Sequence, residues 1–217
     1  MTIKPHPLSL PGWKALARVP ETLYPAPPPP LTLLLHGWLG DETVTWVFAN
    51  RLPKNHLLVA PRGIYEPIPG KFGWVPRLGE LPTLARFQPA VESLLDLLDQ
   101  VKENLDHDPG PINLVGFSQG AALAYAFAVA HPARVAAIAG LAGFVPPDLE
   151  ILVPNQPLAG KRVFLAHGTE DETIPIEIAR AGVSILQKLG ASVTTCEDRV
   201  GHKLGAGCFR ALGEFFA

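Results

Sequence analysis

Short apolar runs alternate along the chain with longer segments in which apolar residues recur every three or four positions. The runs of strand length lie at 31–37, 56–63, 112–118, 135–141, 162–168 and 192–197. The segments with helical spacing lie at 88–105, 119–130, 176–189 and from 206 onward. The first two runs are apolar almost throughout, which is typical of strands buried on both faces of a parallel sheet. This alternation predicts an α/β fold with a doubly wound, mostly parallel sheet and helices on both faces.

One domain accounts for the whole chain. Its 217 residues are 47% apolar and 18% charged, enough to bury a substantial core, and neither an internal repeat nor a shift in composition divides them. The sequence therefore predicts a single domain over residues 1–217. Residues 1–30 are interpreted as an N-terminal lead-in, in which the proline-rich stretch Pro25–Pro30 is a stiff extended segment before the first parallel strand.

Charge and cysteine content limit the possible partners. The formal net charge is −2 and like charges form no run, so the surface of a nucleic-acid or anionic-membrane binder is not expected. The N-terminal residues lack the apolar stretch of a secretory signal, and we expect a cytoplasmic protein without stable membrane insertion that acts on a small molecule. Cys196 and Cys208 are too few for a disulfide framework or a four-thiolate metal site, and we interpret them as reduced, structural thiols.

The sequence Gly116-Phe117-Ser118-Gln119-Gly120 directly follows an apolar run and precedes an alanine-rich helical segment. In this strand–turn–helix setting, Gly-x-Ser-x-Gly is typical of a nucleophile elbow. The turn forces the serine into an unfavourable backbone region, and side chains two residues to either side would collide, so both flanking positions need glycine. We therefore expect Ser118 to present its hydroxyl above the sheet as a nucleophile.

A serine hydroxyl needs a neutral imidazole to accept its proton and an acid to orient that imidazole. The chain order in this setting is serine, acid, histidine. His202, in a loop between the last strand and the last helix, is the histidine that lies downstream of the best acid candidate, Asp171. Asp171 itself follows a strand and precedes a helix that begins with proline. Three further acids remain alternatives to Asp171: Glu170, Glu172 and Asp198.

The oxyanion formed during acyl transfer requires backbone N–H donors. One is expected from Gln119, directly after the nucleophile, and the other from the glycine-rich turn at 36–41. We choose Trp38 in that turn, although the sequence leaves open which of its amides points inward.

Loops at the carboxyl ends of parallel strands build ligand sites, so the irregular stretch from Gly63 to Thr83 is a candidate substrate wall. Aromatic residues in or beside these loops predict a pocket for an apolar acyl or alcohol group. The aromatic residues expected in this pocket are Trp38, Trp46, Phe72, Trp74 and Phe144.

Together these motifs resemble the phospholipase/carboxylesterase branch of the α/β-hydrolases, which includes the acyl-protein thioesterases. The resemblance extends from Leu31 to the C-terminus and rests on the order and spacing of LLHGWLGDE, APRG, GFSQGA, AGFVP, HGTEDETIP and GH. It implies a monomeric or homodimeric esterase of single-domain α/β-hydrolase fold, without metal or organic cofactor. The site residues that it implies are Ser118, Asp171 and His202, with Trp38 and Gln119 as oxyanion donors.

Two positions depart from the family pattern, and both lie at the pocket or its edge. Ala142 stands where this family often has serine, and the last strand reads Thr-Thr-Cys-Glu-Asp where an aromatic is common. The leading hypothesis is a serine carboxylesterase that cleaves esters of small to medium acyl groups through an acyl-enzyme. A thioesterase or lysophospholipase would use the same catalytic residues with a different pocket. A hypothesis of another class is a catalytically silent hydrolase fold that serves as a binding protein.

Overall fold

The computed structural model describes residues 5–20, 28–105, 108 and 110–217. Its centre is an eight-stranded sheet in the order β1-β2-β4-β3-β7-β8-β9-β10. The parallel strands are β3 (Leu31–Leu35), β4 (Leu57–Pro61), β7 (Ile112–Phe117), β8 (Val135–Leu141), β9 (Arg162–Gly168) and β10 (Ser192–Asp198). Each of them coincides with one of the predicted segments of strand length, so the predicted doubly wound, mostly parallel sheet is confirmed.

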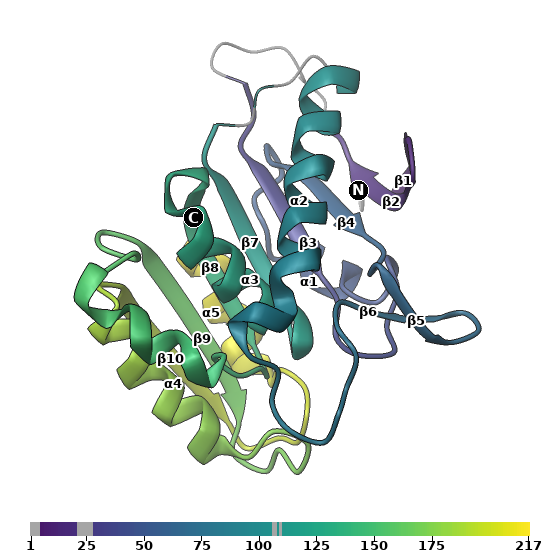
Figure 1. Cartoon of the computed structure of the whole chain (residues 1–217). Helices are drawn as coiled ribbons and strands as arrows, with labels where there is room; N and C mark the ends of the chain where they lie inside the picture. The colour runs from purple at the N-terminus through teal and green to yellow at the C-terminus, as the bar shows by residue number, and fades with distance from the viewer. Residues whose placement is uncertain (1–4, 21–27, 106–107, 109) are drawn as a thin grey trace.

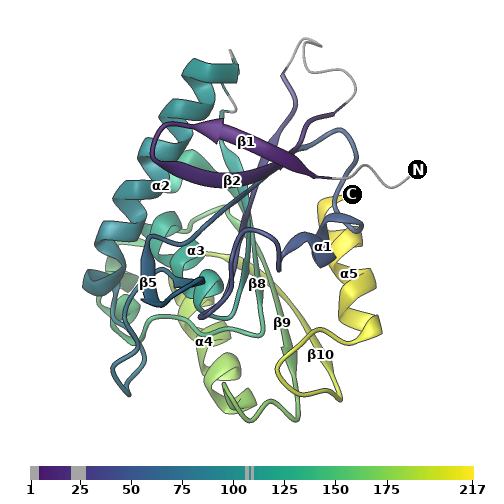
Figure 2. The same cartoon turned by 90° about the vertical axis from the view of Figure 1, so that its right-hand side faces the viewer.

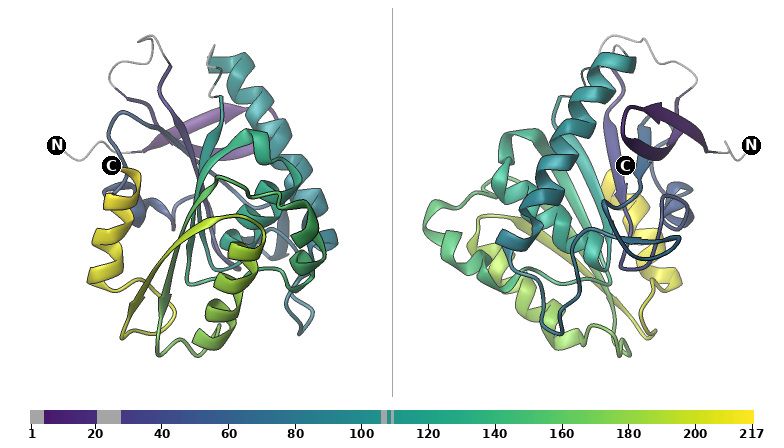
Figure 3. Two further views of the ribbon diagram at one scale, coloured as in Figure 1. Left: turned by 90° about the vertical axis from the view of Figure 1, so that its left-hand side faces the viewer. Right: turned by 45° about the vertical axis from the view of Figure 1, so that its right-hand side comes forward.

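Helices cover both faces of this sheet (Figure 1, Figure 2). On one face lie the three long helices α2 (Leu84–Leu105), α3 (Gln119–Ala130) and α4 (Ile176–Lys188). On the other face lie α1 (Trp46–Ala49) and α5 (Ala206–Phe216). Figure 3 shows α5 separated from the three long helices by the sheet. Each face has its own cluster of buried apolar side chains, as a two-sided sheet requires. Two 3-10 segments, η1 (Pro132–Arg134) and η2 (Pro147–Asn155), follow α3 and β8.

The helix α2 begins at Leu84, ahead of the predicted start at residue 88. The carboxylate of Asp148 in η2 accepts the backbone N–H of Leu84, with oxygen distances of 2.8 and 3.0 Å. This contact satisfies an N–H that has no partner within the helix. Because the two residues are 64 positions apart in the sequence, the local pattern could not show where the helix begins.

Part of the predicted lead-in belongs to the sheet. β1 (His6–Leu10) and β2 (Trp13–Arg18) form an antiparallel hairpin, and β2 pairs with β4 in antiparallel direction. The hairpin turns at Gly12, whose φ of 73° suits glycine, and it extends one edge of the sheet (Figure 2). The Pro11-Gly12 pair was the available sequence signal for this turn. Residues 25–27 of the proline-rich stretch lie outside the described residues.

The stretch from Gly63 to Thr83 also contains regular structure. β5 (Tyr65–Ile68) and β6 (Lys71–Gly73) form a small antiparallel sheet that turns at Gly70. Prolines in and beside β5 hid this hairpin, because proline is depleted in strands. Figure 1 shows the hairpin projecting beside the lower end of α2.

The two cysteines are bonded to each other. Cys196 in β10 and Cys208 in the first turn of α5 form a disulfide, with their Cα atoms 5.5 Å apart. The interpretation as reduced thiols is therefore wrong for this structure. Strand and helix pack side by side, which a separation of 12 residues in the sequence does not reveal. The bond closes a covalent loop that contains His202.

Candidate active site

Ser118 lies in the sharp turn between β7 and α3. Its backbone angles, φ 54° and ψ −116°, are strained for a residue with a side chain. A Cβ atom at Gly116 would be 2.2 Å from the carbonyl oxygen of Gly120, and one at Gly120 would be 2.1 Å from that of Leu35. Neither position has room for a side chain. The glycines are thus required by the turn that places the Ser118 hydroxyl at the end of the sheet.

His202 and Asp171 form a hydrogen-bonded chain with this hydroxyl. Nε2 of His202 is 3.0 Å from Oγ of Ser118, and Nδ1 of His202 is 2.7 Å from Oδ2 of Asp171. The carboxylate of Asp171 accepts a hydrogen bond from the N–H at Nδ1, which leaves Nε2 as the acceptor for the serine O–H. The three residues follow β7, β9 and β10, whose carboxyl ends meet at one edge of the sheet. The structure brings the three predicted catalytic residues together.

Asp171 is buried, and hydrogen bonds fix the orientation of its carboxylate. Its Oδ1 accepts the backbone N–H groups of Thr173 and Ile174, both at 2.9 Å, while Oδ2 faces His202. The turn that follows β9 therefore supplies its own donors to the acid. These donors satisfy one oxygen of the buried carboxylate and leave the other oxygen directed at the imidazole.

The other candidate acids have different surroundings. Glu170 forms an ion pair with Arg199 at 2.6 Å, and both side chains are exposed. Glu172 is also exposed. Oδ2 of Asp198 accepts the backbone N–H of Cys208 at 2.8 Å, at the start of α5. These carboxylates therefore lie at the surface or at a helix start rather than against the imidazole.

A second histidine, His167, is buried next to the acid. Its Nε2 donates to the carbonyl of Ile174 at 2.8 Å and lies 3.4 Å from Oδ2 of Asp171. Both contacts stabilise the turn in which Asp171 lies. Sequence reasoning passed over His167 because it precedes the acid, although its position at the end of a buried strand was a usable signal.

His36 organises the glycine-rich turn after β3. The side chain is fully buried, its Nε2 accepts the N–H of Gly63 at 2.8 Å, and its Nδ1 donates to the carbonyl of Gly37 at 2.7 Å. Burial lowers the pKa of His36, so the imidazole is neutral near pH 7. The turn places Trp38 beside the nucleophile, where this residue lines the cavity at Ser118.

Gln119 contributes both its backbone and its side chain. As the first residue of α3, its N–H has no acceptor within the helix and is suited to an oxyanion. The side-chain Oε1 accepts the N–H of Trp74 at 2.7 Å, and Nε2 donates to the carbonyl of Val75 at 3.0 Å. These two bonds link the elbow to the stretch from Gly63 to Thr83, a role of Gln119 that the sequence did not predict.

A cavity of about 250 Å³ lies at Ser118 and Gln119. Trp38 and Phe144, two of the predicted aromatic residues, are in its wall. Its other side chains include Arg77, Glu80, Leu81, Ile174 and Ile178. Several of these belong to the stretch from Gly63 to Thr83, so this stretch lines the cavity as expected of a substrate wall.

Three predicted pocket residues lie elsewhere. Trp74, within the stretch from Gly63 to Thr83, is buried and donates its indole N–H to the carbonyl of His36 at 2.8 Å. The ring of Phe72 stacks under the guanidinium of Arg62, 4.3 Å from the ring centroid. Trp46 packs against the apolar cluster beneath α1 and α5. Each of these rings contacts another part of the protein, and none of the three lines the cavity at Ser118.

One group of possible metal ligands exists among the described residues. Cys196, Asp198 and Cys208 have their ligand atoms within 4.8 Å of one another. The two sulfur atoms are bonded to each other there, so neither is a thiolate that could bind a metal.

A strained serine at a strand–turn–helix elbow, an imidazole at its hydroxyl and a buried carboxylate behind the imidazole define a serine hydrolase of the α/β-hydrolase fold. The chain belongs to the phospholipase/carboxylesterase family, whose model matches residues 24–216. The predicted family, fold and enzyme class are therefore confirmed, and ester hydrolysis is the activity that the family supports.

Relatives include both thioesterases and carboxylesterases. Acyl-protein thioesterase 1 of Yarrowia lipolytica is 31% identical over 166 residues, which cover 68% of this chain and 72% of that protein. Carboxylesterase SOBER1 of Arabidopsis thaliana is 28% identical over 189 residues, covering 80% of this chain and 81% of that protein. A carboxylesterase of Bacillus cereus has the same fold, with a TM-score of 0.80 over 94% of this chain and 93% of that one, at 22% identity. Among the described helices, none is both long and apolar enough for a bilayer crossing.

Proposed function

We propose that the protein hydrolyses carboxylic esters of small to medium acyl groups through an acyl-enzyme on Ser118. The observation that supports this most directly is the chain of two hydrogen bonds from Ser118 through His202 to Asp171, at 3.0 and 2.7 Å. The strained elbow supports it further, because backbone strain of this kind is retained where a nucleophile must be exposed.

In the first half of the reaction, Nε2 of His202 accepts the hydroxyl proton while Oγ of Ser118 bonds to the ester carbonyl carbon. The carbonyl oxygen becomes an oxyanion, which accepts hydrogen bonds from the backbone N–H groups of Gln119 and Trp38. The bond from carbon to the leaving oxygen then breaks, and that oxygen takes the proton from Nε2. The alcohol leaves, and the acyl group remains on Oγ.

In the second half, a water molecule gives a proton to Nε2 of His202 as its oxygen bonds to the acyl carbon. The bond from this carbon to Oγ breaks, and Ser118 takes the proton back. Asp171 stabilises the imidazolium in both halves and stays ionised. These steps need no metal or organic cofactor, so we expect the activity to survive treatment with a chelator.

The volume of the cavity at Ser118 supports the proposal that the acyl group is small to medium in size. Its volume of about 250 Å³ is just below the usual range for pockets that hold drug-sized ligands. Apolar side chains such as Phe144 and Ile178 favour an alkyl chain over a polar group.

A thioesterase is the second candidate, supported by the similarity to an acyl-protein thioesterase. The same groups would act on a thioester, and only the leaving atom would differ. Comparing kcat/KM for matched oxygen esters and thioesters of one acyl group separates the two functions. A higher value for the oxygen ester supports the carboxylesterase.

A fluorophosphonate probe tests the proposal against a non-catalytic binding protein. We expect the wild type to be labelled on Ser118 and Ser118→Ala to be unlabelled while folded, as judged by circular dichroism. Folded wild type that takes up no label and hydrolyses no nitrophenyl ester would contradict the proposal.

We propose a cytoplasmic location and a monomeric or homodimeric state. The Cys196–Cys208 bond argues against this location, because disulfides persist in oxidising compartments and are rare in the cytosol. Alkylating the thiols of cells at the moment of lysis, followed by mass spectrometry, tests it. Alkylated cysteines support the cytoplasm, and an intact bond contradicts it.

A further inference from the structure

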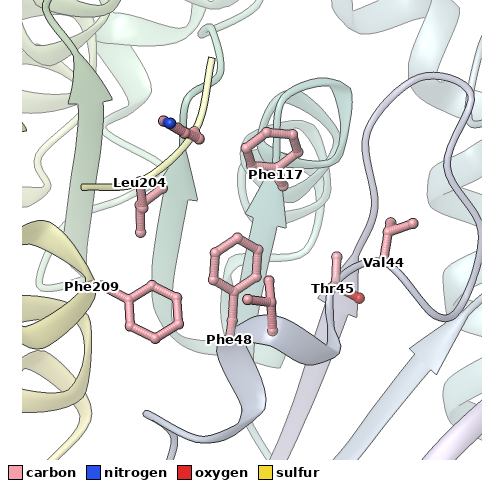
Figure 4. A pocket seen from close by; sticks show the side chains of 8 residues that line it. Val44, Thr45, Phe48, Phe117, Leu204 and Phe209 are labelled. Carbon is pink, nitrogen blue, oxygen red and sulfur yellow. The ribbon is translucent and has the colours of Figure 1, made fainter. Parts of the chain in front are cut away.

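A second cavity lies on the face of the sheet that α1 and α5 cover (Figure 4). Its volume is about 230 Å³. Its apolar lining residues are Val44, Val47, Phe48, Phe117, Leu204 and Phe209. We call it the α1–α5 pocket. In the described part of the chain, none of these residues lines the cavity at Ser118.

The α1–α5 pocket is adjacent to the catalytic residues on the side of the histidine. Phe117 directly precedes Ser118, and Lys203, which also lines the pocket, directly follows His202. The rings of Phe117 and His202 have their centroids 5.1 Å apart. The cavity at Ser118, in contrast, is lined by Gln119, whose N–H is a proposed oxyanion donor. The two cavities are therefore lined by the two chain neighbours of the nucleophile, Phe117 in the α1–α5 pocket and Gln119 in the cavity at Ser118.

The walls of the α1–α5 pocket suit an apolar group. Phe48 is 6.1 Å from Phe117 and 6.0 Å from Phe209 between ring centroids, and Figure 4 shows these rings around a common space. Val44 and Val47 are 48% and 56% exposed, so apolar surface is open to water at this pocket. A bound aryl or branched alkyl group would remove that surface from water, which is favourable.

Acyl transfer assigns the two parts of an ester to different sides of the serine. The carbonyl oxygen must face the oxyanion donors, and the leaving oxygen must lie near Nε2 of His202, which protonates it. Whatever is attached to the leaving oxygen therefore extends on the side of His202. We infer that the α1–α5 pocket binds the alcohol part of the ester substrate, and that this part is an aryl or branched alkyl group. This inference rests on the proposed function.

Two isomeric esters test this assignment. Benzyl acetate has its phenyl ring on the alcohol side, and methyl phenylacetate has the same ring on the acyl side. Val47→Asp places a carboxylate at the α1–α5 pocket on an exposed position of α1, where folding tolerates it. We expect kcat/KM for benzyl acetate to fall on the order of tenfold, because the charge opposes burial of the ring, and that for methyl phenylacetate to change less than about twofold.

Matched variants control for the added charge and for folding. Ile151→Asp changes a β-branched residue that is 77% exposed on η2, away from both cavities, and should leave both esters unaffected. Val47→Ile keeps the apolar surface and should retain wild-type selectivity. If Val47→Asp fails to fold, Val44→Asp makes the same change at a neighbouring exposed lining residue.

The outcomes separate this inference from the proposed function. A selective loss on benzyl acetate supports the alcohol site. Equal losses on both esters, a loss confined to methyl phenylacetate, or no loss at all would overturn it while ester hydrolysis remains. A wild type that fluorophosphonate labels but that cleaves neither isomer also overturns it. Absence of both labelling and hydrolysis refutes the proposed function itself.

Discussion

Replacing Gln119 with alanine tests how strongly the elbow depends on the stretch from Gly63 to Thr83. The substitution removes two buried hydrogen bonds, one from the N–H of Trp74 at 2.7 Å and one to the carbonyl of Val75 at 3.0 Å. Each backbone group would then be buried without its side-chain partner, at a cost of about 1–3 kcal/mol. We therefore expect the free energy of unfolding to fall by about 2–6 kcal/mol.

Urea denaturation followed by tryptophan fluorescence measures this loss. Gln119→Met fills the same space without polar atoms, so it separates the lost hydrogen bonds from the cavity that alanine leaves. Gln88→Ala changes the same residue type on the exposed side of α2, where its one bond to Glu92 should be worth about 0.5 kcal/mol or less. If both Gln119 variants unfold within about 0.5 kcal/mol of the wild type, the argument is refuted.

Three further predictions concern the acid, the buried histidine and the disulfide. Asp171→Asn should lower kcat on nitrophenyl acetate about 10⁴-fold by favouring the wrong imidazole tautomer, and a similar loss in Asp198→Asn instead would point to the other acid. Because burial lowers the pKa of His36, the unfolded chain binds a proton more readily than the folded one. Stability should therefore be complete above the unfolded pKa of about 6.5 and fall below it, and denaturation of His36→Gln in urea from pH 8 to 5 should show a weaker dependence. Reducing the Cys196–Cys208 bond should lower the unfolding free energy by about 3 kcal/mol, and an unchanged urea midpoint with reductant would contradict this.

The sheet was predictable because its strands are buried on both faces. A run such as Leu31–Leu35, apolar at nearly every position, has few alternatives to a central strand between two helical layers. The hairpin of β1 and β2 was missed because it is an edge element, where exposed and buried positions mix and the apolar pattern is weak. The start of α2 was missed because its cap comes from Asp148, a residue remote in sequence.

The site was predictable as far as local turns and chain order reach. The glycines around Ser118 reflect close backbone contacts, and the order of serine, acid and histidine left few choices. Which aromatic ring faces the cavity depends on contacts between distant segments. Trp74 turns toward the carbonyl of His36 and Phe72 toward Arg62, and neither pairing leaves a periodic trace in the sequence.

The ring closed by Cys196 and Cys208 has a consequence for proteolysis. Arg199 and Lys203 both lie within this ring and are exposed, so a trypsin-like protease can reach the backbone between the two cysteines. A cut there would leave the disulfide as the last covalent link between α5 and the body of the protein. On a denaturing gel, such a nicked molecule should migrate as one species without reductant. With reductant, the C-terminal segment should separate from the rest of the chain.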